Sequence, residues 1–236
     1  MEERAAKIEV LLPDKEDITG KVSNLKLVGD KILICSHTED SIFMYVKKDN
    51  AYECLFKLPK EFKIRDGTFR LQSPGGFFQM KRNYYIIDNQ SKMIYRVLPR
   101  SEAVSPFFSL CSLKNNSSSA ILSSGSSRIT DLVYHNDQLW FTARAGYSSS
   151  ISMYDFKTNS ISFNSFSKGP FPNGIAIDPA GKHYWILDSY NRQLYKLSTE
   201  GKFVLSSPIK GYEGYQLTGL LMDKDGSFKT VGVKYP

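Results

Sequence analysis

Residues 172–205 constrain the fold most, because they contain four short hydrophobic stretches in a row, separated by tight-turn signals. Gly, Pro, Asn and Ser, which favour the dihedral angles of turns, stand at the connections between these stretches. Four consecutive short strands joined in this way are typical of one blade of a β-propeller. The four predicted strands span residues 175–177, 183–187, 193–197 and 202–205.

The same pattern recurs elsewhere, as a repeat architecture requires. The second and third strands of the unit reappear at residues 32–47, 84–98 and 139–156. Each third strand contains a tyrosine, and we expect its ring to fill the gap between neighbouring blades with its hydroxyl on a polar partner. The four tyrosines are Tyr45, Tyr95, Tyr154 and Tyr195.

A fifth unit is incomplete at the C-terminus, where strands are predicted only at residues 220–222 and 228–233. Residues 7–13 resemble the fourth strands at 52–59 and 202–208. We therefore expect the N-terminal strand to join the C-terminal blade, because a propeller closes its ring by building one blade from both chain ends.

These units predict an all-β protein, a single β-propeller domain over residues 1–236 with four-stranded antiparallel blades. Five blades are preferred, but six stay open, because repeats of about 40 to 45 residues fit the chain length either way. A missed strand pair would lie in residues 60–75 or 113–128. The predicted blades span residues 21–59, 76–112, 129–168 and 172–208, and the fifth combines 216–236 with 7–13.

Composition places few limits on function. At 236 residues and 41% hydrophobic content, the chain can bury a sizeable core. The acidic first residues and the lack of long apolar runs predict no signal peptide and no membrane span, with a cytoplasmic location by default. Cys35, Cys54 and Cys111 lack metal-binding spacing, so we expect reduced core residues. We also expect a monomer.

Residues 172–205 resemble an NHL repeat, through Gly-Ile-Ala in the first strand, Asp-Ser after the second, Asn-Arg in the next turn and Gly-Lys-Phe in the fourth strand. They are also similar to a blade of the gluconolactonase and senescence-marker family, which shares the Pro-Asn-Gly start. Both families build six-bladed propellers. The second resemblance implies a divalent metal in the central channel, held by Glu, Asn and Asp, that activates water against a lactone.

Asn173 occupies the position of the metal-binding Asn that this resemblance implies. No carboxylate stands at the equivalent positions, although a hard cation needs anionic oxygen ligands. Asp131 is one position away and reaches the channel if the register shifts by one. We favour turn roles for Asn173 and Asp188 over a calcium or zinc site at Asn173 and Asp131, and expect no cofactor. The equivalent positions in the other units are Ser23, Gly75, Thr130 and Thr218.

Positive charge is concentrated in one part of the sequence. Residues 57–100 carry ten basic and three acidic side chains, which alone account for the net charge of +7 of the whole chain. Such a segment favours an acidic partner, a phosphorylated ligand or nucleic acid. The candidate patch for an anionic partner comprises Lys60, Lys63, Arg65, Arg70, Lys81 and Arg82.

The leading hypothesis is a non-enzymatic propeller that binds a protein or other ligand on one face of the ring, through the loops between second and third strands. One alternative is a metal-dependent hydrolase of the gluconolactonase type, acting on a lactone or ester. The other is an RNA-binding NHL module that uses a basic second blade. The candidate binding surface is His37, Glu39, Asp40, Asn89, Arg144, Tyr147, Tyr190, Asn191 and Arg192.

Overall fold

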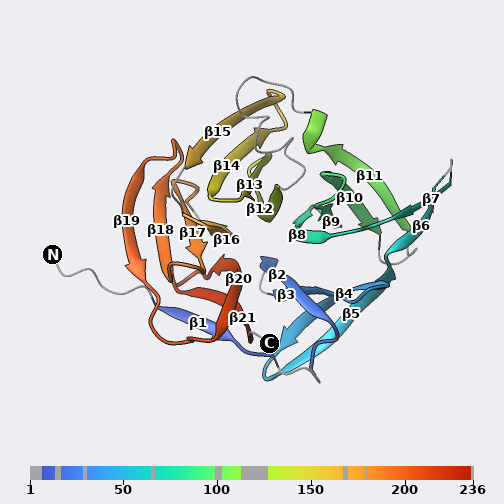
Figure 1. Cartoon of the computed structure of the whole chain (residues 1–236), viewed down its shortest axis with the longest axis horizontal. Coiled ribbons are helices and arrows are strands. Elements are labelled where there is room, and N and C mark those ends of the chain that lie inside the picture. The colour runs from blue at the N-terminus through green and yellow to red at the C-terminus, as the bar shows by residue number, and fades with distance from the viewer. Residues whose placement is uncertain are drawn as a thin grey trace.

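A computed structural model describes residues 7–13, 17–28, 31–64, 67–98, 103–112, 127–166, 170–178 and 180–234. In these ranges the chain forms five β-sheets arranged as blades around a central axis (Figure 1), so the predicted five-bladed propeller is confirmed. Within the same ranges no helix is long and apolar enough to cross a membrane.

Four blades are four-stranded antiparallel sheets whose strands follow one another in the chain. The first comprises β2 (Lys21–Val28), β3 (Lys31–His37), β4 (Ser41–Lys48) and β5 (Ala51–Pro59). The second comprises β8 (Pro74–Met80), β9 (Asn83–Asp88), β10 (Met93–Leu98) and β11 (Ala103–Ser109), with a 3₁₀ turn at Leu110–Ser112. The third comprises β12 (Arg128–His135), β13 (Gln138–Ala145), β14 (Ser148–Asp155) and β15 (Ser160–Phe166). The fourth comprises β16 (Pro172–Ile177), β17 (His183–Asp188), β18 (Gln193–Ser198) and β19 (Phe203–Pro208).

The fifth blade joins the two ends of the chain, as predicted. It contains β20 (Tyr215–Met222), β21 (Phe228–Lys234) and β1 (Ile8–Leu11). β1 runs parallel to β21, with Ile8 opposite Phe228, whereas the third strand of every other blade is antiparallel to the second. The N-terminal strand therefore closes the ring by pairing directly with the second strand of the blade.

A strand pair does lie in the stretch 60–75. β6 (Glu61–Ile64) and β7 (Gly67–Arg70) form a separate two-stranded hairpin between the first and second blades, and they do not make a sixth blade. Most of the other stretch, residues 113–126, lies outside the described residues.

Hydrophobic clusters between neighbouring blades form the core. Tyr45 packs with Leu221 and Val231 of the fifth blade, and Tyr154 packs with Phe78 and Ile87 of the second. The predicted position of the repeated tyrosine rings between neighbouring blades is confirmed, because all four belong to clusters that join two blades. The Thr19 N–H donates to the Tyr45 hydroxyl at 3.0 Å, and the Tyr154 hydroxyl donates to Asn159 Oδ1 at 2.5 Å.

The prediction that all three cysteines are core residues is wrong for two of them. Cys35 is buried on β3, whereas Cys54 and Cys111 are exposed. Cys54 lies on β5, the edge strand of its blade, where much of the strand surface meets solvent.

Candidate functional site

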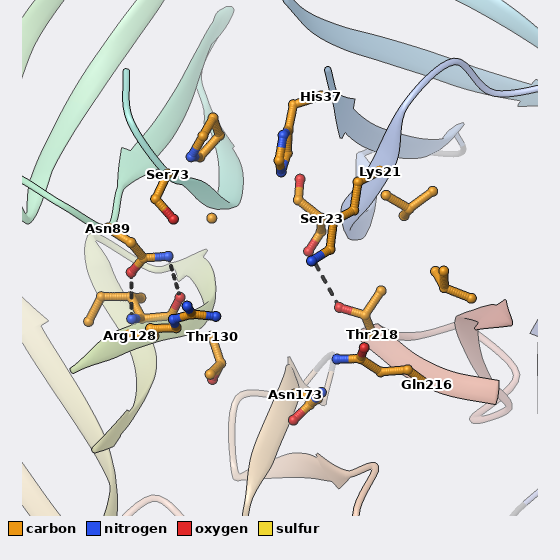
Figure 2. Close-up of a pocket in the computed structure, with 15 residues that line it drawn as sticks. Lys21, Ser23, His37, Ser73, Asn89, Arg128, Thr130, Asn173, Gln216 and Thr218 are labelled. Atoms are coloured by element: carbon orange, nitrogen blue, oxygen red, sulfur yellow. Dashed lines mark hydrogen bonds between the residues drawn. The ribbon is translucent and has the colours of Figure 1, made fainter. Parts of the chain in front are cut away.

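The strands nearest the axis begin around an open cavity of about 300 Å³, here called the channel mouth (Figure 2). These inner strands are β2, β8, β12, β16 and β20, and each contacts the next around the ring. His37, at the end of β3, and Asn89, directly after β9, reach the same cavity. The polar side chains that line the mouth are Lys21, Ser23, His37, Ser73, Asn89, Arg128, Thr130, Asn173, Gln216 and Thr218.

A break in strand register near the start of each inner strand shapes this lining. In β2 the pairing with β3 skips Ser23, and in β16 the pairing with β17 skips Asn173. An unpaired residue of this kind turns its side chain away from the regular alternation of the strand. The positions singled out by aligning the repeats, Asn173 with Ser23, Gly75, Thr130 and Thr218, all line the mouth.

Hydrogen-bond donors and positive charge dominate the channel mouth. The side chains of Lys21 and Arg128 end in cationic nitrogen groups and that of Gln216 in an amide, and all three point toward the same open space (Figure 2). Lys21 and Arg128 are exposed, and Arg144 lines an adjoining cavity together with Arg128 and Asn173. No carboxylate belongs to the described residues that line either cavity.

His37 completes the polar lining without adding a charge near neutral pH. Its Nδ1 lies 3.4 Å from Lys60 Nζ. Burial, and then the charge of Lys60, hold the pKa of His37 below its usual value. The imidazole is therefore neutral at pH 7, and Lys21 and Arg128 supply the positive charge at the mouth.

One residue further along the inner strands, a polar network joins three blades. Asp131 is fully buried, and its Oδ1 lies 2.6 Å from Lys26 Nζ and accepts a hydrogen bond of 2.7 Å from Asn24 Nδ2. Its Oδ2 accepts the N–H of Ile175 at 2.8 Å. Asp131 is thus held by protein donors, and the calcium or zinc site at Asn173 and Asp131 stays a prediction. No group of three or more His, Cys, Asp or Glu side chains is placed to hold a metal ion in the described part of the chain.

At the level of this network, two glycines allow neighbouring inner strands to approach each other closely. A Cβ on Gly174 would lie 2.7 Å from the backbone of Gly219, and one on Gly219 would lie 2.6 Å from the Leu25 nitrogen. Gly219 also has a φ of +66°, which side chains rarely tolerate. Neighbouring inner strands therefore approach each other backbone to backbone here.

Several predicted binding residues hold the loops of this face together. Asp188 Oδ1 accepts the N–H of Asn191 at 2.9 Å, which agrees with the turn role expected for Asp188. The Asn191 side chain donates back to Asp188 at 2.8 Å, and Arg192 Nη2 donates to the Tyr215 carbonyl at 2.6 Å. Asn89 similarly donates to and accepts from the backbone of Ile129.

Three other members of the predicted surface form an aromatic rim beside the mouth. Tyr147 and Tyr190 project from the β13–β14 and β17–β18 turns, and their rings lie 6.5 and 5.4 Å from that of Phe171, centroid to centroid. The Arg144 guanidinium lies 4.9 Å from the Phe171 ring centroid. We call Arg144, Tyr147, Phe171 and Tyr190 the aromatic rim.

The candidate basic patch is spread over the molecule. Lys60 is buried beside His37, whereas Lys63 is exposed on β6. Arg70 donates to Asp40 Oδ1 and to the Glu39 carbonyl, both at 3.2 Å, which places these three on the loop side of the first blade. Lys81 and Arg82 form the β8–β9 turn, at the opposite end of the second blade from Asp88, and Arg65 lies outside the described residues.

Four residues of the mouth and the rim were not predicted from the sequence: Lys21, Arg128, Gln216 and Phe171. A signal was present, because Lys21 and Arg128 each stand two residues before the aligned positions Ser23 and Thr130. Phe171 precedes the Pro-Asn-Gly start of β16, where nothing in the pattern marks it as a ring that two exposed tyrosines contact.

Comparison with known proteins identifies the fold. No family model matches the chain, and no curated protein matches it. Among solved structures, glutaminyl cyclase of Myxococcus xanthus superposes with a TM-score of 0.61 at 7% identity, covering 99% of this chain and 95% of that one. The chain is a β-propeller.

Two further solved structures are similar to this propeller. A luciferin-regenerating enzyme gives a TM-score of 0.58 at 11% identity, over 90% of this chain and 70% of that one. A chain of a nidogen/laminin complex gives 0.55 at 14% identity, over 86% and 69%. At these identities the likeness establishes the fold alone.

Proposed function

We propose that this propeller is a binding protein that takes an anionic group of its ligand at the channel mouth. One observation carries the proposal: Lys21 and Arg128 face the cavity, Arg144 lines the adjoining one, and no carboxylate lines either among the described residues. Cations that converge on a concave surface raise the local concentration of anions and bind them through charge-assisted hydrogen bonds.

The neutral side chains at the mouth suit the same ligand. The side-chain amides of Asn173 and Gln216 add N–H donors at the rim of the cavity. The buried carboxylate of Asp131 beneath them does not oppose an anion, because Lys26 lies 2.6 Å from it. We assign these residues a binding role and no catalytic step.

The metal-dependent hydrolase remains the alternative. Its support is the likeness of residues 172–205 to a gluconolactonase blade and the placement of Asn173 at the mouth. Against it, Asp131 is already held by Lys26, Asn24 and Ile175. The NHL likeness, with RNA as ligand, also stays a prediction, because the basic residues of the second blade point to different parts of the molecule.

Isothermal titration with citrate tests the proposal, since citrate is a compact multivalent anion. We expect Arg128→Gln and Lys21→Gln each to weaken citrate binding by about tenfold, as for a lost hydrogen bond to a charged group. The matched controls Arg82→Gln and Lys182→Gln remove the same charge from exposed turns at the other end of the blades. Equal losses in all four variants, or no binding by the wild type, would overturn the proposal.

A further inference from the structure

The aromatic rim exposes more ring surface than a small anion bound in the mouth would contact. Tyr147 is 82% exposed and Tyr190 76% exposed, although both contact the buried ring of Phe171. Tyr is enriched in the surfaces through which proteins bind their partners. The rim therefore points to a ligand that extends beyond the mouth.

Arg144 connects the rim with the mouth. Its guanidinium lies over the Phe171 ring, and the same side chain lines the cavity shared with Arg128 and Asn173. Its Nε donates to the Gly146 carbonyl at 3.2 Å, which steadies the turn that carries Tyr147. A ligand anchored by its anionic group at Arg128 thus leaves the mouth past Arg144 and across the two tyrosines.

We propose that this face binds an acidic peptide segment of another protein, with a carboxylate in the channel mouth and an apolar side chain against Tyr147 and Tyr190. The inference rests on the proposed function and names its ligand. Arg and Tyr side chains contribute a large share of the binding energy in protein interfaces, and a tyrosine loses little conformational freedom on binding.

Other charged side chains on the face favour a peptide over a polynucleotide. A nucleic acid strand needs a positive track along successive phosphates. Here Lys92 and Arg192 donate to backbone carbonyls, and Arg70 pairs with Asp40. Glu39 and Asp40 are exposed on the loop of the first blade, so the positive surface stops there. One anchored anion next to apolar rings matches an acidic peptide.

Selection from a displayed library of random dodecapeptides tests this. We expect the wild type to enrich peptides that combine Asp or Glu with an apolar residue. A labelled enriched peptide should bind the Tyr147→Ala/Tyr190→Ala double variant at least tenfold more weakly, as for lost interface anchors. Both tyrosines are exposed, so the fold is expected to persist. Phe203→Ala, which removes an exposed ring on β19, is the matched control and should bind normally.

Citrate titrations separate this inference from the proposed function. Citrate should bind the double tyrosine variant as tightly as the wild type, because the mouth is intact. If citrate binds but no acidic peptide is enriched, or the tyrosine substitutions leave peptide binding unchanged, the peptide inference alone is overturned. It is also overturned if a twelve-nucleotide oligouridine binds more tightly than the best peptide and requires the same tyrosines. Absence of citrate binding to the wild type overturns both.

Discussion

Lys26 Nζ lies 2.6 Å from Asp131 Oδ1, and both side chains are buried between inner strands of different blades. Burial lowers the pKa of Lys26 and raises that of Asp131, in each case against the attraction of the partner. The Ile175 N–H on β16 completes the network at 2.8 Å from Asp131 Oδ2. One carboxylate thus joins the first, third and fourth blades directly beneath the channel mouth.

Loss of this carboxylate charge should destabilise the whole ring. Asp131→Asn leaves the Lys26 ammonium buried without its counter-ion, and breaking a buried pair from one side typically costs about 3 to 5 kcal/mol. Urea unfolding of Asp131→Asn should show a loss of this size. The control is Glu53→Gln, which breaks the exposed pair with Lys48 and should change the free energy of unfolding by about 1 kcal/mol or less.

The double variant Lys26→Met/Asp131→Leu distinguishes the pair from simple packing. Because both charges are removed together, the double variant should be more stable than Asp131→Asn. If the double variant loses as much free energy of unfolding as the Lys26→Met and Asp131→Leu single variants together, the interaction between Lys26 and Asp131 contributes little.

One of the three thiols should react much more slowly than the other two. Burial raises the pKa of Cys35 to about 11, so its thiolate is scarce at pH 8 and shielded from reagent. Cys54 and Cys111 are exposed. Native protein should therefore titrate two thiols quickly with Ellman's reagent and the third only after unfolding. Three fast thiols in the native protein would contradict the buried position of Cys35.

Anion binding should strengthen in mild acid because of His37. Burial and Lys60 hold the pKa of His37 below its usual value of about 6.5, so its ring gains a proton as the pH falls into the acid range. The new charge lies at the mouth near Lys21 and Lys60, and sulfate keeps its charge over this range. Sulfate affinity should rise from pH 7 to pH 5 in the wild type, and the rise should be smaller in His37→Gln.

Protonation of His37 should lower the free energy of unfolding, although it strengthens anion binding. The pKa of His37 is lower in the folded than in the unfolded protein. The contribution of the neutral ring to the free energy of unfolding is therefore complete above the unfolded pKa of about 6.5, and it is lost as the pH falls through the folded pKa. Without an anion, the wild type should therefore lose more stability than His37→Gln between pH 7 and pH 5. An equal loss in the two proteins would contradict the assigned pKa direction.

Divalent cations should leave the thermal stability unchanged. Lys26, Asn24 and Ile175 already hold the carboxylate of Asp131, and the remaining lining of the mouth supplies neutral or cationic groups. Calcium or zinc at 1 mM should therefore not raise Tm. A rise that disappears in Asn173→Ala would favour the hydrolase alternative instead.

Much of the fold was predictable because a propeller repeats itself. Aligning the strands predicted five blades and the tyrosines between them. The same alignment matched Asn173 with Ser23 and Thr130, which lie together at the mouth because the ring is closed. The parallel pairing of β1 was not predictable, since hydrophobic pattern carries no strand direction.

Charge was harder to predict than fold. The excess of basic residues in the second blade drew attention there, but Lys81 and Arg82 lie in a turn at the far end of that blade and Lys60 is buried. Lys21 and Arg128 are more than a hundred residues apart, so only closure of the ring places them around one cavity.

Anion binding at the channel mouth can be observed in a crystal soaked in selenate, compared with one soaked in calcium. We expect an anomalous selenium peak at the channel mouth, within hydrogen-bonding distance of Arg128 and Lys21, and no calcium there. A calcium ion bound by Asn173, or a mouth without selenate while selenate binds elsewhere on the protein, would contradict the proposal.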